Sequence, residues 1–320
     1  MSPTPTLADP VLRDTPGYQE SDEYLPKIIS KMNEEEKAHL YYLIEKKAWI
    51  KATQVDEFTD EELTKLAQLE KKKGPKASRK AANVLYNRHH WTALRWFLFG
   101  GLVDIPIQEN PKKAWDPQTN PFIKMRVRSF VYTQDEHDDS KPIKRLPDKE
   151  YLRLLSYAWV HEPKIVVPKS RQMMVTWLYS SIGVHETLFR QAKTTAWISK
   201  KFDDANANID KRIQLISNRL PRERLYVPKH KYVKGLFECE STGSIIRAMG
   251  EEAKGLRQYT FSWVFDDEAA FQEQAEGIVQ AALPTVNGGG RLTLVSSANG
   301  KEVFYNLVTE NGRIPAPPGK

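Results

Sequence analysis

IVVPKSRQMMVTWLYS, residues 165–180, places an apolar run of β-strand composition before a short turn and a helical pattern. A phosphate-binding loop of the form G-x-x-x-x-G-K-[ST] occupies this position between a strand and a helix. Aligned on Thr176, however, the first glycine of that form is replaced by Lys169, the second by Met174 and the lysine by Val175. The stretch is therefore either a variant phosphate loop or an ordinary strand–turn–helix unit.

Strands and helices alternate around this stretch from about residue 122 onward. Strand composition recurs at 164–167, 194–199, 244–249, 261–265 and 291–297, and helical patterns fill most of the gaps. This alternation predicts an α/β fold with a largely parallel central sheet flanked by helices. Ligands bind such sheets at the carboxyl ends of the strands, so the polar residues after each strand are the candidates for a site.

The remainder of the chain divides by composition. Residues 1–22 are rich in Pro, Thr and Asp, which indicates a flexible tail, and residues 23–115 have a mainly helical pattern. The Pro-, Asn- and Gln-rich stretch 104–121 predicts a connector, which leads into an α/β domain over 116–312. Residues 313–320 have the composition of a linker.

Two local patterns in the helical region allow sharper predictions. Thr59 and Glu62 have the spacing of a capping box at a helix N-terminus. His89 and His90 are adjacent in a helical pattern, so their side chains point in different directions, and no Cys or acidic residue stands near them in the sequence. A packing or surface pair is favoured there over a metal site.

Composition and charge exclude several protein classes. The 320 residues are 40% hydrophobic and 28% charged, which is typical of a soluble globular protein. No apolar run is long enough to span a bilayer, and the N-terminus lacks the pattern of a signal peptide. A single cysteine, Cys239, excludes an intramolecular disulfide and a cysteine-based zinc site. The net charge of +7 favours a polyanionic partner, but only weakly.

Acidic side chains follow the strand predicted at 261–265. In hydrolytic P-loop NTPases, an acid that ends a strand holds the Mg²⁺ shell, and the next glutamate polarises the attacking water. Asp267 and Glu268 fit these two roles, although a solvated turn or a helix N-terminus also favours carboxylates. A further polar cluster, Ser296, Ser297 and Asn299, follows the strand at 291–297.

The opening stretch supplies the complementary groups. Thr176 places a hydroxyl near the start of a helix, where it can reach Mg²⁺. Lys169 and Arg171 are long enough to reach back over bound phosphates, and Gln172 can donate further hydrogen bonds. The alternative is that both cations lie on a surface turn, which the missing glycines favour.

Together these segments resemble the ATPase domain of the large terminase subunit, the DNA-packaging motor of tailed bacteriophages. The resemblance rests on KSRQMMVTW (169–177), DEAAF (267–271) and SSANGKEVFYNL (296–307), and it covers about residues 120–310. It implies a P-loop NTPase fold of the ASCE type, preceded by a small helical region. Met174 and Ala298 depart from the family, which has a glycine and a proline at these positions.

The resemblance also implies a role for each site residue. It implies that ATP and Mg²⁺ are the cofactors and that Glu268 acts on the attacking water. Arg257 is expected to act as an arginine finger, on the nucleotide of a neighbouring subunit, or to lie exposed in a loop; Tyr151 is expected to stack on adenine or to pack a helix. The remaining implied roles are phosphate binding by Lys169, Ser170, Arg171, Gln172 and Thr176, metal binding by Thr176 and Asp267, and coupling by Ser296, Ser297 and Asn299.

The partners implied by the family are double-stranded DNA, the small terminase subunit, the portal protein of the procapsid and further copies of this chain in a ring. No membrane contact is expected, and the expected location is the host cell cytoplasm. The family continues into a nuclease domain, which nothing after residue 310 can form. We therefore expect no nuclease activity from this chain, which is an excised domain, a fragment or half of a split protein.

Two other functions are compatible with the same residues. A helicase-like, nucleic-acid-dependent ATPase uses the same fold and would separate strands without a capsid. A non-catalytic assembly or DNA-binding module with a decayed phosphate loop is supported by Met174 and Val175. The presence of Asp267, Glu268 and Thr176 together argues against the decayed module.

Overall fold

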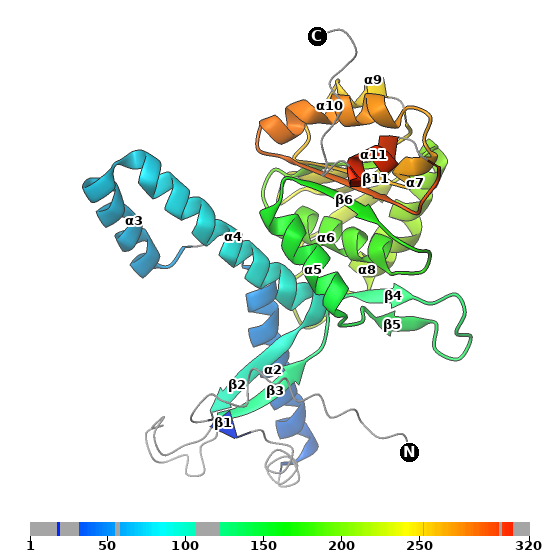
Figure 1. Ribbon diagram of the computed structural model, residues 1–320. Coiled ribbons are helices and arrows are strands. Elements are labelled where there is room, and N and C mark those ends of the chain that lie inside the picture. The colour runs from blue at the N-terminus through cyan, green and yellow to red at the C-terminus, as the bar shows by residue number, and fades with distance from the viewer. Residues whose placement is uncertain are drawn as a thin grey trace. The chain divides into compact units, whose positions relative to one another are not determined.

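The computed structural model describes residues 18–19, 32–54, 58–106, 122–251, 253–300 and 303–309 (Figure 1). The chain divides into two compact units. One comprises Met1–Ala48 with Gly101–Val127, and the other comprises Trp49–Gly100 with Arg128–Lys320. No helix among the described residues is long and apolar enough to cross a bilayer.

The first unit contains a three-stranded sheet and most of helix α2 (Glu34–Thr53). β2 (Gly101–Pro106) and β3 (Phe122–Val127) pair antiparallel along their whole length, and β1 (Tyr18–Gln19) lies parallel to β3. β2 lies within residues 23–115, for which the sequence predicts mainly helices. Gly100 and Gly101 end the helical pattern, and the strand begins at Gly101. Most of the predicted connector, residues 107–121, lies outside the described residues.

The second unit is built around a seven-stranded sheet. The strands lie in the order β6 (Lys164–Pro168), β12 (Arg291–Ser296), β11 (Trp263–Asp267), β7 (Thr194–Ile198), β10 (Ser244–Met249), β9 (Leu236–Cys239) and β8 (His230–Val233). The first five run parallel, and β9 and β8 extend the sheet antiparallel. The predicted α/β fold with a largely parallel sheet is therefore confirmed.

Helices cover both faces of this sheet (Figure 1). One face is covered by α5 (Glu150–His161), α6 (Val175–Phe189) and α8 (Gln214–Asn218), and the other by α10 (Ala275–Asn287) and α11 (Val303–Thr309). The short helices α7 (Phe202–Asn208), η2 (Ile209–Ile213), α9 (Ala253–Leu256) and η3 (Ala269–Phe271) lie in the connections.

Alternation along β11 gives each face its own core. Val264 packs with Leu292, Ile278 and Phe304 on the face covered by α10 and α11. Trp263 and Phe265 point to the opposite face because successive strand residues alternate. There the centroid of the Phe265 ring lies 5.2 Å from that of Tyr179 in α6. Residues 266 and 267 continue this alternation and therefore point to different faces.

All five strands predicted in the α/β region are present, with ends that differ by up to two residues. The largest difference is in β11, which begins at Trp263 and includes Asp266 and Asp267. The antiparallel hairpins β8–β9 and β4 (Tyr132–Gln134) with β5 (Ile143–Arg145) are additional to the predicted strands.

A helical hairpin formed by α3 (Asp60–Lys73) and α4 (Pro75–Phe99) precedes the sheet. The capping box predicted at Thr59 and Glu62 is confirmed, because each side chain accepts a hydrogen bond from the other residue's backbone N–H. Gly74 joins the two helices at a φ of +85°, a conformation that favours glycine.

Candidate active site

Three strands end at the same level at one edge of the sheet. Val295 of β12 is paired with Val167 of β6 on one side and with Asp267 of β11 on the other. The three polar clusters predicted from the sequence follow these strands. Parallel order and register therefore bring together segments that are more than 100 residues apart in the chain.

The loop from Lys169 to Met174 connects β6 to α6. Its first backbone N–H, from Lys169, donates to the carbonyl oxygen of Ser296 at 2.9 Å, which ties the loop to the end of β12. Gln172 and Met174 have φ values of +63° and +55°, in the left-handed region that non-glycine residues seldom adopt. Met174 therefore takes the backbone conformation typical of glycine in place of the glycine of a standard phosphate loop.

The first turn of α6 is open to an anion. Among the described residues, no side chain caps its N-terminus. The first backbone N–H groups of a helix have no partner within the helix, and together with the helix dipole they favour negative charge. The loop therefore ends at unsatisfied donors, as phosphate binding requires.

Thr176 and Asp267 meet across this edge. The Thr176 hydroxyl donates to Oδ2 of Asp267 at 3.2 Å, which joins the second residue of α6 to the last residue of β11. Asp267 is 5% exposed, and its Oδ1 has no hydrogen-bond partner among the described residues. An unpartnered carboxylate oxygen beside a hydroxyl is the kind of oxygen donor set that Mg²⁺ prefers, so these two residues fit the metal that the sequence implies.

The charge of Asp267 is balanced by its neighbours. Burial raises the pKa of the Asp267 carboxyl, and the carboxylate of Glu268 raises it further. The cations of Lys169 and Arg212 and the hydrogen bond from Thr176 oppose this rise. A divalent cation bound here would favour the ionised carboxylate in the same way.

Asp266 plays a different part from Asp267. It points to the α10 face, where Nε2 of Gln272 donates to its Oδ1. Its side chain is fully buried, and burial raises its pKa well above the usual range. Asp266 therefore lies on the opposite face of the sheet from Asp267, which is the acid that pairs with Thr176.

Glu268 follows Asp267 at a sharp change of direction. Its φ is +61°, its side chain is exposed, and η3 begins at the next residue. Three of the four described non-glycine residues with positive φ are thus Gln172, Met174 and Glu268, at the two strand ends that meet here. Residues held in sparsely populated backbone conformations cluster at functional sites, because the surrounding structure must hold them there.

The end of β12 links the other two loops. The Ser296 hydroxyl accepts a hydrogen bond from Ala270 N at 3.1 Å, and Asn299 Nδ2 donates to Ala270 O at 2.9 Å. The Ser296 carbonyl also accepts from Lys169 N, so this segment is hydrogen-bonded to both of the other loops. Ser297 lies between them, half-buried.

Fewer contacts among the described residues join the remaining predicted site residues to this edge of the sheet. Tyr151, in α5, donates from its hydroxyl to Met173 O at 3.2 Å, so it contacts the loop. Gln172 Nε2 lies 3.1 Å from His137 Nε2. Ser170, Arg171 and Arg257 are exposed. Among the described residues, no hydrogen bond or ion pair joins Arg257, which follows α9, to the loop.

Arg212 is a site neighbour that the sequence does not reveal. Its guanidinium lies 5.5 Å from the centroid of the Trp177 ring and donates to Asn208 Oδ1. Burial lowers the pKa of Arg212, and the negative charges of Asp267 and Glu136 oppose this shift. It comes from η2, a π-helical turn; such turns are frequent at functional sites but have no signature in helical periodicity.

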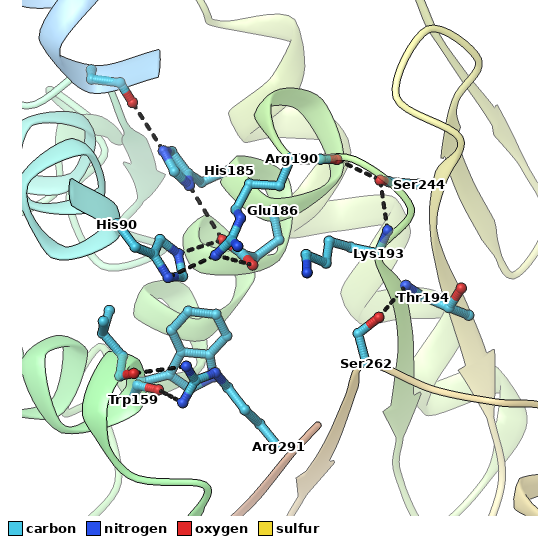
Figure 2. A network of polar contacts seen from close by, with 12 residues as sticks. His90, Trp159, His185, Glu186, Arg190, Lys193, Thr194, Ser244, Ser262 and Arg291 are labelled. Atoms are coloured by element: carbon cyan, nitrogen blue, oxygen red, sulfur yellow. Dashed lines mark hydrogen bonds and ion pairs between the residues drawn. The ribbon is translucent and has the colours of Figure 1, made fainter. Parts of the chain in front are cut away.

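A second titratable cluster joins α4 to α6. Figure 2 shows His90, Glu186 and Arg190 converging: His90 Nε2 lies 2.7 Å from Glu186 Oε1, and Arg190 Nη1 lies 2.7 Å from His90 Nδ1. His185 Nε2 lies 2.9 Å from Ala52 O, and its Nδ1 lies 3.5 Å from Glu186 Oε1.

His90, His185 and Glu186 have the donor atoms of a metal site, within 4.8 Å of one another. However, Arg190 donates to Nδ1 of His90, so the imidazole proton lies on Nε2 and is donated to Glu186. Arg190 thus already supplies the cation, and burial lowers the pKa of His90. The cluster is a packed junction between helices, in agreement with the packing role favoured for His90 from the sequence.

The chain is similar to solved structures of phage large terminases. No family model matches the sequence, and no curated protein matches it. The large terminase of bacteriophage HK97 matches at 12% identity and a TM-score of 0.42, over 52% of this chain and 37% of that one. A Thermus phage large terminase ATPase domain matches at 18% and 0.38, over 50% and 73% respectively.

A third match is the large terminase of a thermophilic bacteriophage in complex with ADP, at 16% identity and a TM-score of 0.33, over 42% of this chain and 34% of that one. The chain thus matches little more than a third of the full length of the HK97 and ADP-bound large terminases. These three solved structures are phage large terminases, the family that the motifs of the chain resemble.

Proposed function

We propose that this chain is the ATP-hydrolysing motor part of a viral terminase large subunit, which drives double-stranded DNA into a procapsid. The observation that carries the proposal is the pairing of Thr176 with Asp267, which leaves one buried carboxylate oxygen free beside a phosphate-type loop. The charge of Lys169 lowers the pKa of Asp267, which supports a cation near the same site.

Phosphate binding falls to the loop and to α6. The unpaired N–H groups at the start of α6 and the side chains of Lys169, Ser170, Arg171 and Gln172 would hold the phosphate oxygens. Thr176 and Asp267 would hold Mg²⁺, which neutralises charge on the phosphates when it is bound. Tyr151 lies against the loop at Met173, and its ring would contact the adenine.

Hydrolysis needs a base beside the terminal phosphate. Glu268 follows the metal-binding Asp267, is exposed, and would accept the proton of the attacking water. Its left-handed backbone turns the chain after β11, so its carboxylate does not continue the alternation of Asp266 and Asp267. Arg257 would stabilise transition-state charge on the nucleotide of a neighbouring copy, an effect worth about 10³-fold or more in related enzymes.

Coupling of hydrolysis to movement falls to the end of β12. Ser296 and Asn299 hold Ala270 of the acidic loop, and Ser296 also holds Lys169. Loss of the terminal phosphate would release Lys169, and this segment, with Ser297, would pass the change to a DNA-gripping surface. The small terminase subunit, the portal protein and a ring of copies, working in the host cytoplasm, complete the proposed motor.

Substitution of the proposed base tests the function. Glu268→Gln is expected to lower ATP turnover by about 10²-fold or more, because a positioned general base contributes that much. ATP affinity should change little, since Thr176, Asp267 and the loop are intact. Turnover is measured by phosphate release, and affinity by titration calorimetry at millimolar Mg²⁺.

Glu273→Gln is the matched control, because Glu273 is an exposed acid five residues further along the chain. Its turnover should equal that of the wild type. Unchanged turnover in Glu268→Gln would remove Glu268 from the mechanism. A wild-type chain that binds no ATP at millimolar concentration would instead indicate a non-catalytic module, and strand separation without a capsid would indicate a helicase-like motor.

A further inference from the structure

The tip of the α3–α4 hairpin has an unusual concentration of positive charge. Residues 71–80, KKKGPKASRK, contain six basic side chains and no acidic one. All six are exposed: Lys71, Lys72, Lys73, Lys76, Arg79 and Lys80. They lie in the last turn of α3 and the first two turns of α4, on either side of Gly74.

These six cations have no acidic partner in the part of the chain that the structure describes. Some exposed lysines elsewhere do have an acidic partner: Lys65 lies 2.6 Å from Glu61, and Lys231 lies 3.7 Å from Glu238. The four acids of α3, Asp60, Glu61, Glu62 and Glu70, all precede the tip. No acid among the described residues therefore pairs with the positive charge of the tip.

The tip also accounts for most of the excess charge of the protein. The formal net charge is +7, and residues 71–80 carry +6, so the other 310 residues sum to +1. Basic residues occur throughout the sequence, but outside the tip acidic residues almost balance them. The excess of positive charge therefore lies at the tip. A polyanion attracted to this chain would meet that excess at one place.

The hairpin holds the tip in a defined shape. The Ser78 hydroxyl donates to Leu66 O at 3.1 Å, which joins α4 to α3 beside the turn. Further from the tip, His89 Nε2 lies 3.0 Å from Glu62 Oε1, and Leu66, Leu69 and Leu85 line the space between the helices. In Figure 1 the two helices lie side by side and meet at the turn. A surface built on a fixed scaffold loses little conformational entropy when it binds.

We propose that this tip binds the phosphate backbone of double-stranded DNA without reading its base sequence. Lysine and arginine are the side chains that neutralise phosphates, and such contacts position a protein on DNA without specifying sequence. The choice of DNA among polyanions rests on the proposed motor function.

Salt dependence of DNA binding tests this assignment. The full chain with Lys71, Lys72 and Lys73 all changed to Gln is titrated against a fluorescent duplex at several salt concentrations. The slope of log K against log salt is negative, and each lost phosphate contact reduces its magnitude by about 0.9. Loss of all three contacts therefore reduces the magnitude by about 2.7. Two duplexes of equal length and unrelated sequence should be bound equally, before and after the change.

The control changes the same number of charges elsewhere. Lys229, Lys231 and Lys234 are exposed around the β8–β9 hairpin, and the last two lie near acids, 3.7 Å from Glu238 and 3.9 Å from Asp203. Their triple change to Gln should leave the slope unchanged. Equal slopes for the wild type and the tip variant, or equal losses in both variants, would overturn the proposal. Tip-dependent binding to anionic phospholipid vesicles without any tip-dependent binding to DNA would also overturn it.

ATP hydrolysis without DNA separates this inference from the proposed function. The tip residues take no part in the proposed chemistry, so the tip variant should hydrolyse ATP as the wild type does. If the wild type hydrolyses ATP but its DNA binding does not depend on the tip, the inference about the tip is overturned and the proposed function is not. A wild-type chain that does not hydrolyse ATP but binds DNA through the tip would overturn the proposed function alone.

Discussion

Met174 shows how one side chain can stand where a glycine is expected. Its φ of +55° keeps the phosphate-loop backbone that a glycine would supply, and Leu178 N donates to its carbonyl oxygen at 2.9 Å to start α6. A left-handed conformation destabilises a residue with a Cβ atom by about 1–2 kcal/mol. Met174 therefore does not remove the loop geometry, but it does strain it.

This strain predicts a difference between two neighbouring substitutions. The free energy of unfolding of Met174→Gly should be about 1–2 kcal/mol higher than that of Met173→Gly. Only the change at position 174 removes a Cβ atom from a residue in the left-handed conformation. Both methionines are half-buried, so loss of side-chain packing and gain of flexibility in the unfolded chain affect the two variants alike. Urea denaturation measures both values. Equal stabilities would show that Met174 is unstrained.

The residues of the candidate site differ in how far the sequence reveals them. Thr176, Asp267 and Ser296 could be placed together, because each lies at the carboxyl end of a strand or just after it, and parallel strands bring those ends to one edge. Arg212 could not, because its approach to Asp267 depends on a π-helical turn and on packing against Trp177. The functional roles of these residues stay predictions.

Long, buried helices and strands could be predicted from the sequence, and short, exposed ones could not. The helical pattern that follows the turn in the stretch 165–180 corresponds to α6, since its apolar residues form a continuous pattern. The β8–β9 hairpin is short and half-exposed, so its alternation is weak. Lys234 and Gly235 form its two-residue turn, in which Gly235 has the positive φ that such turns favour.

The junction between α4 and α6 predicts a pH dependence of stability. Burial lowers the pKa of His90 below that of the unfolded chain, so the unfolded state binds more protons as the pH falls through about 6.5. The stabilising contribution is therefore fully present above that pH and is lost below it. Glu186, Arg190, His185 and Arg291 are the charged or titratable groups that act on His90.

Denaturation of the wild type at pH 7, 6 and 5 should show a falling free energy of unfolding, with a slope from His90 of up to about 1.4 kcal/mol per pH unit. His90→Gln should reduce this slope, whatever its effect on stability at pH 7. His39→Gln is the control, because His39 is exposed, and it should leave the slope unchanged. An undiminished slope in His90→Gln would place the titration elsewhere.

At the scale of the whole molecule, the proposed motor needs more than one copy of the chain. Arg257 is exposed, and no described contact brings it to the phosphate loop. If it acts on a neighbouring copy, two inactive variants should complement each other. The Arg257→Ala variant retains Glu268 in its own site, and the Glu268→Gln variant retains an Arg257 that can act in the site of its neighbour.

An equimolar mixture of Arg257→Ala and Glu268→Gln should therefore hydrolyse ATP at a rate well above the sum of the two alone. The rate per chain of the wild type should also rise with protein concentration. Phosphate release over a dilution series measures both effects. A mixture that is no more active than its components would show that Arg257 acts within its own chain or not at all.

The loop from Lys169 to Met174 contains no glycine, and this affects how a motor could work through repeated cycles. Residues with a Cβ atom have fewer conformations than glycine, so this loop has less freedom to lose when a nucleotide arrives. In the proposed motor, its two left-handed residues would keep the loop in the same shape between one nucleotide and the next. Exchange of ADP for ATP would then depend on the movement of Lys169 and Arg171, while the backbone stays ready for the next turnover.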